Sequence, residues 1–139
     1  MNLRLIARDY LVRARARREA LGTLLAAHVH ADVVREAHEV VELILKGALR
    51  FVGVEPPKRH DVEAIVEQFV DRLPDEWREA LVDLRLALAT LSADRSRAFY
   101  GDEERMIPAS DLFTEADARK AIDVVERLLG MLERLVGEG

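Results

Sequence analysis

The chain has 139 residues, of which half are hydrophobic and 34% are charged, with a net charge of −5 and no cysteine. This length fits one domain, and the composition is that of a folded globular protein. The lack of cysteine excludes disulfides, thiolate nucleophiles and cysteine-based zinc sites. No apolar run approaches the ~18–20 residues of a membrane span, and no secretory signal is evident, so we expect a cytoplasmic protein.

The N-terminal part of the chain is basic. Residues 1–50 carry nine basic and six acidic side chains, a balance of +3, whereas residues 51–139 carry twelve basic and twenty acidic ones, a balance of −8. Six arginines fall between Arg4 and Arg18. Such a face can attract phosphate, or it can be a solvated helix surface. The many charges and the scarcity of Asn and Gln favour a thermophilic source, although a high-GC genome gives the same bias.

Apolar residues recur at helical spacing through most of the chain. They predict a first helix up to about residue 27, whose apolar line is interrupted by Arg17, and a second helix from about 32 to 52. Asp32 is a candidate N-cap for the second helix, and Gly53 suits its C-terminal stop. The apolar face of this second helix is predicted to comprise Val33, Val34, Ala37, Val40, Val41, Ile44, Leu45 and Ala48.

The second half of the chain predicts two further long helices and one short one. The short helix starts near Asp61 and ends near residue 72, and a long helix follows from Pro74 to about residue 91. Residues 92–113 are predicted to be irregular, and Thr114 with Asp117 forms a capping box for the last helix. The pattern therefore predicts a single all-α domain, an antiparallel up-and-down helical bundle of four long helices plus one short helix.

The four histidines are His28, His30, His38 and His60. None has the spacing of a helical zinc pair, and capping of a helix junction is the simpler role for His28 and His30, so we expect no metal site. His38 and Glu42 lie one turn apart on the edge of the second helix. They can present an imidazole to a cleft, or they can pack at the boundary of the core.

Two basic segments are candidates for anion binding. Lys58, Arg59 and His60 precede a helix N-terminus, where backbone N–H groups favour an anion; a capped turn is the alternative. The segment 94–100 contains two arginines and an aromatic hydroxyl, Arg95, Arg97 and Tyr100. Arginine binds phosphate with two hydrogen bonds, and tyrosine can stack on a base; an ion-paired surface turn is the alternative.

Together these segments resemble the HEPN family, the higher eukaryotes and prokaryotes nucleotide-binding domain. The resemblance rests on residues 10–15, 37–49, 56–61 and 97–102. It implies a homodimeric helical bundle, which in prokaryotes often acts with a minimal nucleotidyltransferase in a two-component or toxin–antitoxin module. Many members are metal-independent ribonucleases with an arginine four to six residues before a histidine, and no such pair occurs here.

The resemblance leads to three hypotheses. The first is a non-catalytic nucleotide-binding accessory protein, with ligand-binding candidates His38, Glu42, Lys58, Arg59, His60, Arg95, Arg97 and Tyr100. The second is a degenerate endoribonuclease in which Arg95 or Arg97 stabilises charge and His38 or His60 acts as the base. The third is a helical protein-interaction module. We assign no catalytic residue, no cofactor and no metal.

Overall fold

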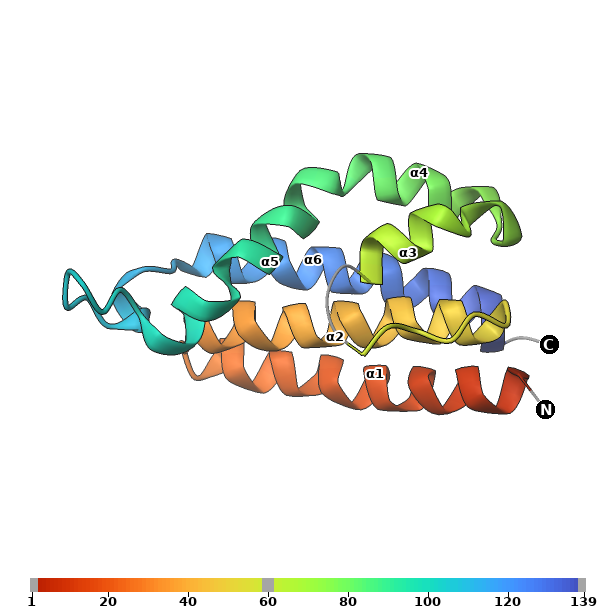
Figure 1. Cartoon of the computed structure of the whole chain (residues 1–139). Helices are drawn as coiled ribbons and strands as arrows, with labels where there is room; N and C mark the ends of the chain where they lie inside the picture. Colours follow the sequence, from red (N-terminus) through yellow and green to blue (C-terminus); the bar gives the residue numbers. More distant parts are fainter. Residues whose placement is uncertain (1–2, 59–61, 138–139) are drawn as a thin grey trace.

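A computed structural model describes residues 3–58 and 62–137, and every regular element in them is helical (Figure 1). The all-α prediction is therefore confirmed. Short 3-10 turns follow α3 and precede α6, and a π-helical turn, Glu133–Gly137, continues α6. The six α-helices are α1 Leu3–Ala26, α2 His30–Phe51, α3 Val62–Gln68, α4 Asp75–Asp83, α5 Arg85–Tyr100 and α6 Glu115–Leu132.

Helix α2 forms the centre of the fold. It contacts α1, α6, α5 and α3, and Figure 1 shows α1 and α6 running alongside it while α3 and α4 lie on one side. Half of its 22 residues are buried, including every residue of the apolar face that the sequence predicted. Burial of that face supplies much of the hydrophobic stabilisation, at roughly 1.5–3 kcal/mol for each large aliphatic side chain.

Of the three helix ends for which the sequence predicted a specific residue, two agree with the structure and one does not. At the start of α6, Thr114 Oγ1 accepts a hydrogen bond from the Asp117 N–H at 3.2 Å, and the Asp117 carboxylate accepts one from the Thr114 N–H at 2.9 Å, so the capping box is confirmed. Gly53 follows α2 with a φ of +81°. Asp32 does not cap α2, because the helix begins earlier and places Asp32 in its first turn, where an acid favours the helix dipole.

The predicted fourth helix is divided. Helix α4 ends at Asp83, and α5 begins at Arg85 in a new direction, although the hydrogen bonds from Leu84 N to Ala80 O and from Leu88 N to Leu84 O are both 2.8 Å (Figure 1). Helix α5 then continues to Tyr100, so the predicted irregular stretch at 92–100 was wrong. Residues 3–58 and 62–137 thus form six α-helices where the sequence predicted four long ones and one short one.

The N-terminal arginines are largely paired with acids. Arg13 pairs with Asp9 at 3.8 Å within α1, and Arg15 pairs with Glu133 at 2.9 Å across the bundle. Arg17 pairs with Glu36 on α2 at 3.8 Å, and Arg18 pairs with Glu126 on α6. These pairs favour the interpretation as a solvated helix face, and each contributes about 0–1 kcal/mol.

The predicted short helix near Asp61 is α3 followed by a 3-10 turn, Val70–Arg72. Asp61 itself lies outside the described residues. Among the helices described, none is both long enough and apolar enough to cross a membrane.

Candidate functional site

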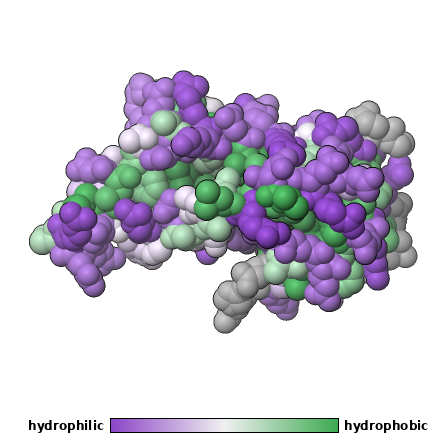
Figure 2. Space-filling model, turned by 90° about the horizontal axis from the view of Figure 1, so that it is seen from above, coloured by the Kyte–Doolittle hydropathy of each residue, from purple (hydrophilic) through white to green (hydrophobic). Residues whose placement is uncertain are grey.

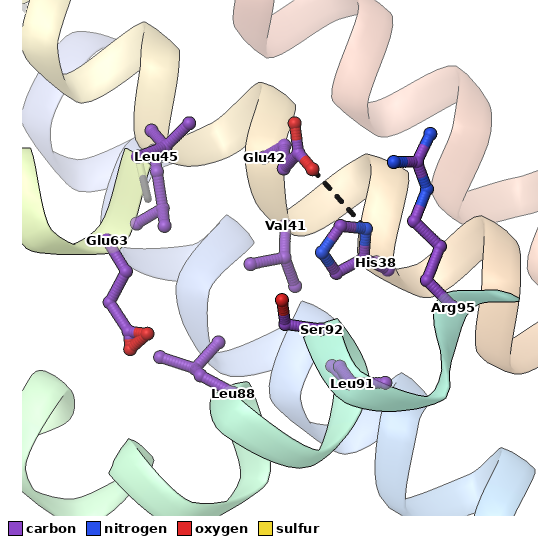
Figure 3. A pocket seen from close by; sticks show the side chains of 10 residues that line it. His38, Val41, Glu42, Leu45, Glu63, Leu88, Leu91, Ser92 and Arg95 are labelled. Carbon is purple, nitrogen blue, oxygen red and sulfur yellow. Dashed lines mark ion pairs between the residues drawn. The ribbon is translucent and has the colours of Figure 1, made fainter. Parts of the chain in front are cut away.

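A pocket of about 210 Å³ opens between α2, α3 and α5 (Figure 3). Five of its ten lining residues are leucines and valines of these helices, and the other five are polar or charged. Its polar groups come from all three helices, so the fold, and not a single sequence motif, assembles them. The lining residues are His38, Val41, Glu42, Leu45, Val62, Glu63, Leu88, Leu91, Ser92 and Arg95.

Helix α2 supplies an imidazole beside a carboxylate, as the one-turn spacing predicted. The His38 side chain is only 12% exposed, and its Nδ1 lies 3.4 Å from Glu42 Oε1 (Figure 3). The contact is not aligned for a hydrogen bond, and Nδ1 is buried without a hydrogen-bond partner among the described residues. On its other side Glu42 lies 3.9 Å from Lys46 Nζ. The His38 ring is thus held close to the Glu42 carboxylate, but its Nδ1 makes no hydrogen bond with that carboxylate.

Burial governs the charge of His38. It lowers the pKa of His38 below 6.5, and the nearby Arg95 guanidinium lowers this pKa further. The carboxylates of Glu42 and Glu39 raise it, but burial has the larger effect. His38 is therefore mainly neutral at neutral pH, so one ring nitrogen is free to accept a proton or a hydrogen bond.

Helix α5 places Arg95 between this pocket and a second hollow. Arg95 Nη2 lies 3.0 Å from Glu39 Oε1 on α2. The second hollow has a volume of about 460 Å³ and is lined by Arg35, Arg95, Ser96, Phe99 and Tyr100. We call these five residues the aromatic shelf. Arg95 is the residue that the pocket and the shelf share.

The aromatic rings of the shelf face solvent. Phe99 is 55% exposed and Tyr100 is 62% exposed, and their ring centroids lie 4.6 Å apart in an edge-to-face arrangement. The Arg35 guanidinium lies 4.7 Å from the centroid of the Phe99 ring. This cation–π contact fixes a positive charge against an exposed aromatic face. Such a surface can hold a nucleobase by stacking and a phosphate by charge.

The structure brings together only some of the candidate residues. His38, Glu42 and Arg95 line one pocket, and Tyr100 joins them through the shelf. Arg97 lines neither hollow; it lies 3.4 Å from Asp94 and its guanidinium is 5.9 Å from the Phe113 ring centroid. Lys58 is exposed at the end of the loop after α2, and the candidates Arg59 and His60 lie outside the described residues.

Sequence reasoning missed several residues of the site, among them Phe99, Arg35 and Ser92. Phe99 stood inside the segment that drew attention to Tyr100, and its apolar character in a predicted loop was a usable signal. Arg35 and Ser92 gave no local signal, because only the packing of α2 against α5 places them here. Within the described residues one cluster of metal-ligating side chains occurs, His28, His30 and Glu115, and it lies outside the pocket.

Comparison with protein families gives a match to the HEPN domain over residues 7–135, which is nearly the whole chain. No curated protein and no solved structure matches significantly. The matched range contains α2, α3 and α5, and therefore every described residue of the pocket and of the shelf.

Proposed function

The chain belongs to the HEPN domain family, and we propose that it binds a nucleotide or an RNA segment, without cleaving it, where the pocket meets the aromatic shelf. One observation carries this proposal: a single guanidinium, that of Arg95, borders both a polar pocket and a pair of exposed aromatic rings. A phosphate would lie at Arg95 and a base would stack on Phe99 or Tyr100.

The chemistry of each group fits this role. Arginine recognises phosphate with two charge-assisted hydrogen bonds, and Ser92 and neutral His38 add hydrogen-bonding groups beside it. Base stacking on an aromatic side chain contributes about 1–3 kcal/mol. Arg95 now pairs with Glu39, so a phosphate would have to replace or share that carboxylate. Binding should therefore weaken as salt rises.

The test is a titration of fluorescent short RNAs and mononucleotides at two salt concentrations. Loss of a stacked base in Phe99→Ala should weaken binding roughly 5- to 150-fold. Arg95→Gln should weaken binding and reduce the slope of log affinity against log salt concentration by about 1, the value for one phosphate contact. Arg97→Gln is the matched control, since it removes the same charge from the same helix outside both hollows. An equal loss in Arg95→Gln and Arg97→Gln would mean that general charge alone attracts the RNA.

A second candidate function, a degenerate metal-independent endoribonuclease, is favoured by one observation. A buried, largely neutral His38 shares a pocket with Arg95, so a general base and a charge stabiliser are close to one another. The family's spacing of arginine before histidine is absent, since no histidine follows His60 in the sequence. The test is cleavage of RNA in the presence of EDTA. If His38→Gln loses this cleavage and Arg97→Gln keeps it, the ribonuclease hypothesis replaces the non-catalytic proposal.

The homodimer that the family implies would fit an apolar groove between α5 and α6. Figure 2 shows apolar surface along the face that carries α3, α4 and α5. The groove is lined by apolar residues of α2, α5 and α6 and by Phe113, together with the polar residues Thr90, Asp94, Asp117 and Lys120. Leu86 at this groove is 81% exposed and Val82 beside it is 60% exposed. Leu86→Glu should convert a dimer to a monomer in light scattering. Met106→Glu should not, because Met106 is an exposed apolar residue outside the groove, in the turn after α5 where Asp102 and Ile107 are hydrogen-bonded.

The partnership with a minimal nucleotidyltransferase is proposed from the family alone. It would be tested by co-expression with a nucleotidyltransferase encoded beside this gene, followed by purification of the complex. Separate elution of the two proteins would remove this part of the proposal and leave nucleotide binding intact.

A further inference from the structure

Three side chains able to bind a metal converge where α1 turns into α2 and α6 begins. His28 lies in the turn, His30 is the first residue of α2, and Glu115 is the first residue of α6. One ligand atom from each lies within 4.8 Å of the other two. The two imidazole rings meet edge to face, with centroids 6.0 Å apart.

The backbone holds these three residues in place. His28 has a φ of +60°, in the left-handed region that histidine tolerates better than most residues, and its N–H donates to Leu25 O at 3.0 Å. Glu115 directly follows Thr114, whose capping box fixes the start of α6. Buried Ala31 anchors the α2 end of the cluster. The convergence thus results from three anchored backbone positions and not from flexible chain ends.

The His30 ring carries a second sign of a site. Its Nε2 is buried and has no hydrogen-bond partner among the described residues. Leaving a buried nitrogen without a hydrogen bond is unfavourable, and a metal ion is one group that satisfies an imidazole lone pair. The sequence had suggested that His28 and His30 cap the junction, but Val29 is the N-cap and α2 has no side-chain cap hydrogen bond.

We propose that His28, His30 and Glu115 form a site for a divalent cation of the zinc type. Two imidazoles and one carboxylate are a ligand set that Zn²⁺ accepts, with the fourth position left to solvent. Ligand bonds of about 2.0–2.2 Å in a tetrahedron place ligand atoms about 3.4 Å apart. The present separations are at most 4.8 Å, and rotation of the exposed His28 and Glu115 side chains can bring the ligand atoms closer.

Arg119 competes with the cation for the carboxylate. Its Nε donates to Glu115 Oε2 at 2.9 Å, one turn along α6. The positive ends of α2 and α6 also face this region and disfavour a cation. Binding must therefore displace Arg119 from Glu115, which predicts that removing Arg119 tightens the site. A pair of histidines that binds the cation without Glu115 would gain less, because Arg119 would then occupy none of its ligands.

The experiment measures binding of Zn²⁺ to the tag-free full chain by calorimetry, with Co²⁺ as a spectroscopic probe. The variants are His28→Asn, which keeps a residue suited to positive φ, His30→Gln and Glu115→Gln. Removing a residue that only hydrogen-bonds to a metal ligand costs about 10–100-fold in metal affinity, so loss of a ligand itself should cost at least about 100-fold. His38→Gln is the control for a histidine elsewhere, and Arg119→Gln is the control for the ion pair.

The proposal expects the chain to bind one equivalent of Zn²⁺ and to give the absorption bands of tetrahedral or five-coordinate Co²⁺. The three ligand variants should lose both the Zn²⁺ binding and the Co²⁺ bands. His38→Gln should keep both, and Arg119→Gln should bind Zn²⁺ more tightly. Each variant's melting curve without metal would show that it is folded. Binding weaker than about 1 mM, or binding that survives His28→Asn or His30→Gln unchanged, would overturn the site. Unchanged affinity in Glu115→Gln would overturn it as a three-ligand site.

Discussion

Replacing Gly101 with alanine should distort the hairpin that follows α5. Gly101 has a φ of +74°, its N–H donates to Arg97 O at 2.8 Å, and Asp102 and Ile107 then exchange backbone hydrogen bonds of 2.8 and 2.9 Å. An alanine Cβ would lie 2.4 Å from the Ile107 carbonyl oxygen and 2.8 Å from the Ala109 nitrogen. Ordinary C···O contacts begin near ~3.3 Å, so the hairpin backbone must move by about 1 Å.

Gly53 offers a matched control. Its φ is +81°, but a Cβ there would meet only the Leu3 side chain, at 3.8 Å. The positive φ costs alanine roughly 1–2 kcal/mol at Gly53. At Gly101, whose ψ of −159° is essentially confined to glycine, the backbone conformation costs alanine at least as much, and overlap with fixed backbone adds roughly 1–3 kcal/mol. For 139 residues the unfolding entropy is about 0.3 kcal/mol per degree. Tm should therefore fall by about 3–7 °C in Gly53→Ala and by about 7–17 °C in Gly101→Ala.

The assay is thermal and urea unfolding followed by far-ultraviolet circular dichroism, with RNA affinity measured on the same samples. Phe99 and Tyr100 directly precede Gly101, so Gly101→Ala should also weaken RNA binding, whereas Gly53→Ala should not. Equal losses of Tm in the two variants would refute the argument that the neighbouring backbone, and not the positive φ, makes Gly101 necessary.

Three further predictions concern His38, α6 and its cap. Because burial lowers the pKa of His38 below 6.5, the unfolded chain binds a proton at a pH where the folded chain does not, so stability present above about pH 6.5 is lost as the pH falls through the folded pKa. His38→Gln should reduce this fall of Tm with pH, and equal falls in the variant and the original protein would refute the role of His38. Thr114→Ala should cost about 1 kcal/mol in urea unfolding through loss of the cap, and an unchanged midpoint would contradict that role. Gly130→Ala, whose Cβ would approach only the flexible end of Arg134, should stabilise by up to about 1 kcal/mol, and a lower Tm would mean that the ion pair of Arg134 with Glu76 was disturbed.

The parts of the fold that the sequence predicted are those with strong local signals. The apolar residues of α2 recur regularly, because α1, α5 and α6 all pack against this helix. Every residue predicted for its apolar face is buried. The capping box at Thr114 requires only side chains within one turn. Helix α5 is different: of its 16 residues only Leu88, Leu91 and Ala98 are buried, so almost no apolar period reveals the helix beyond Leu91.

The candidate site divides in the same way. His38 and Glu42 were predicted because one helical turn joins them, and Arg95 was predicted because basic and aromatic residues cluster in its segment. The pairing of Arg95 with Glu39 and the stacking of Arg35 on Phe99 depend on how α2 packs against α5, which no local pattern encodes. The same holds for His28, His30 and Glu115, whose convergence joins three chain positions through tertiary packing.

The position of Arg95 close to both Glu39 and His38 would couple the proposed phosphate binding to protonation. Its positive charge now lowers the pKa of His38, whereas Glu39 raises it. A phosphate bound at Arg95 would neutralise that charge and bring its own negative charge near the ring, so His38 would bind a proton more readily in the complex. By reciprocity, acid would then strengthen phosphate binding by the same factor. Phosphate and proton would thus bind cooperatively at this pocket, although they contact different side chains.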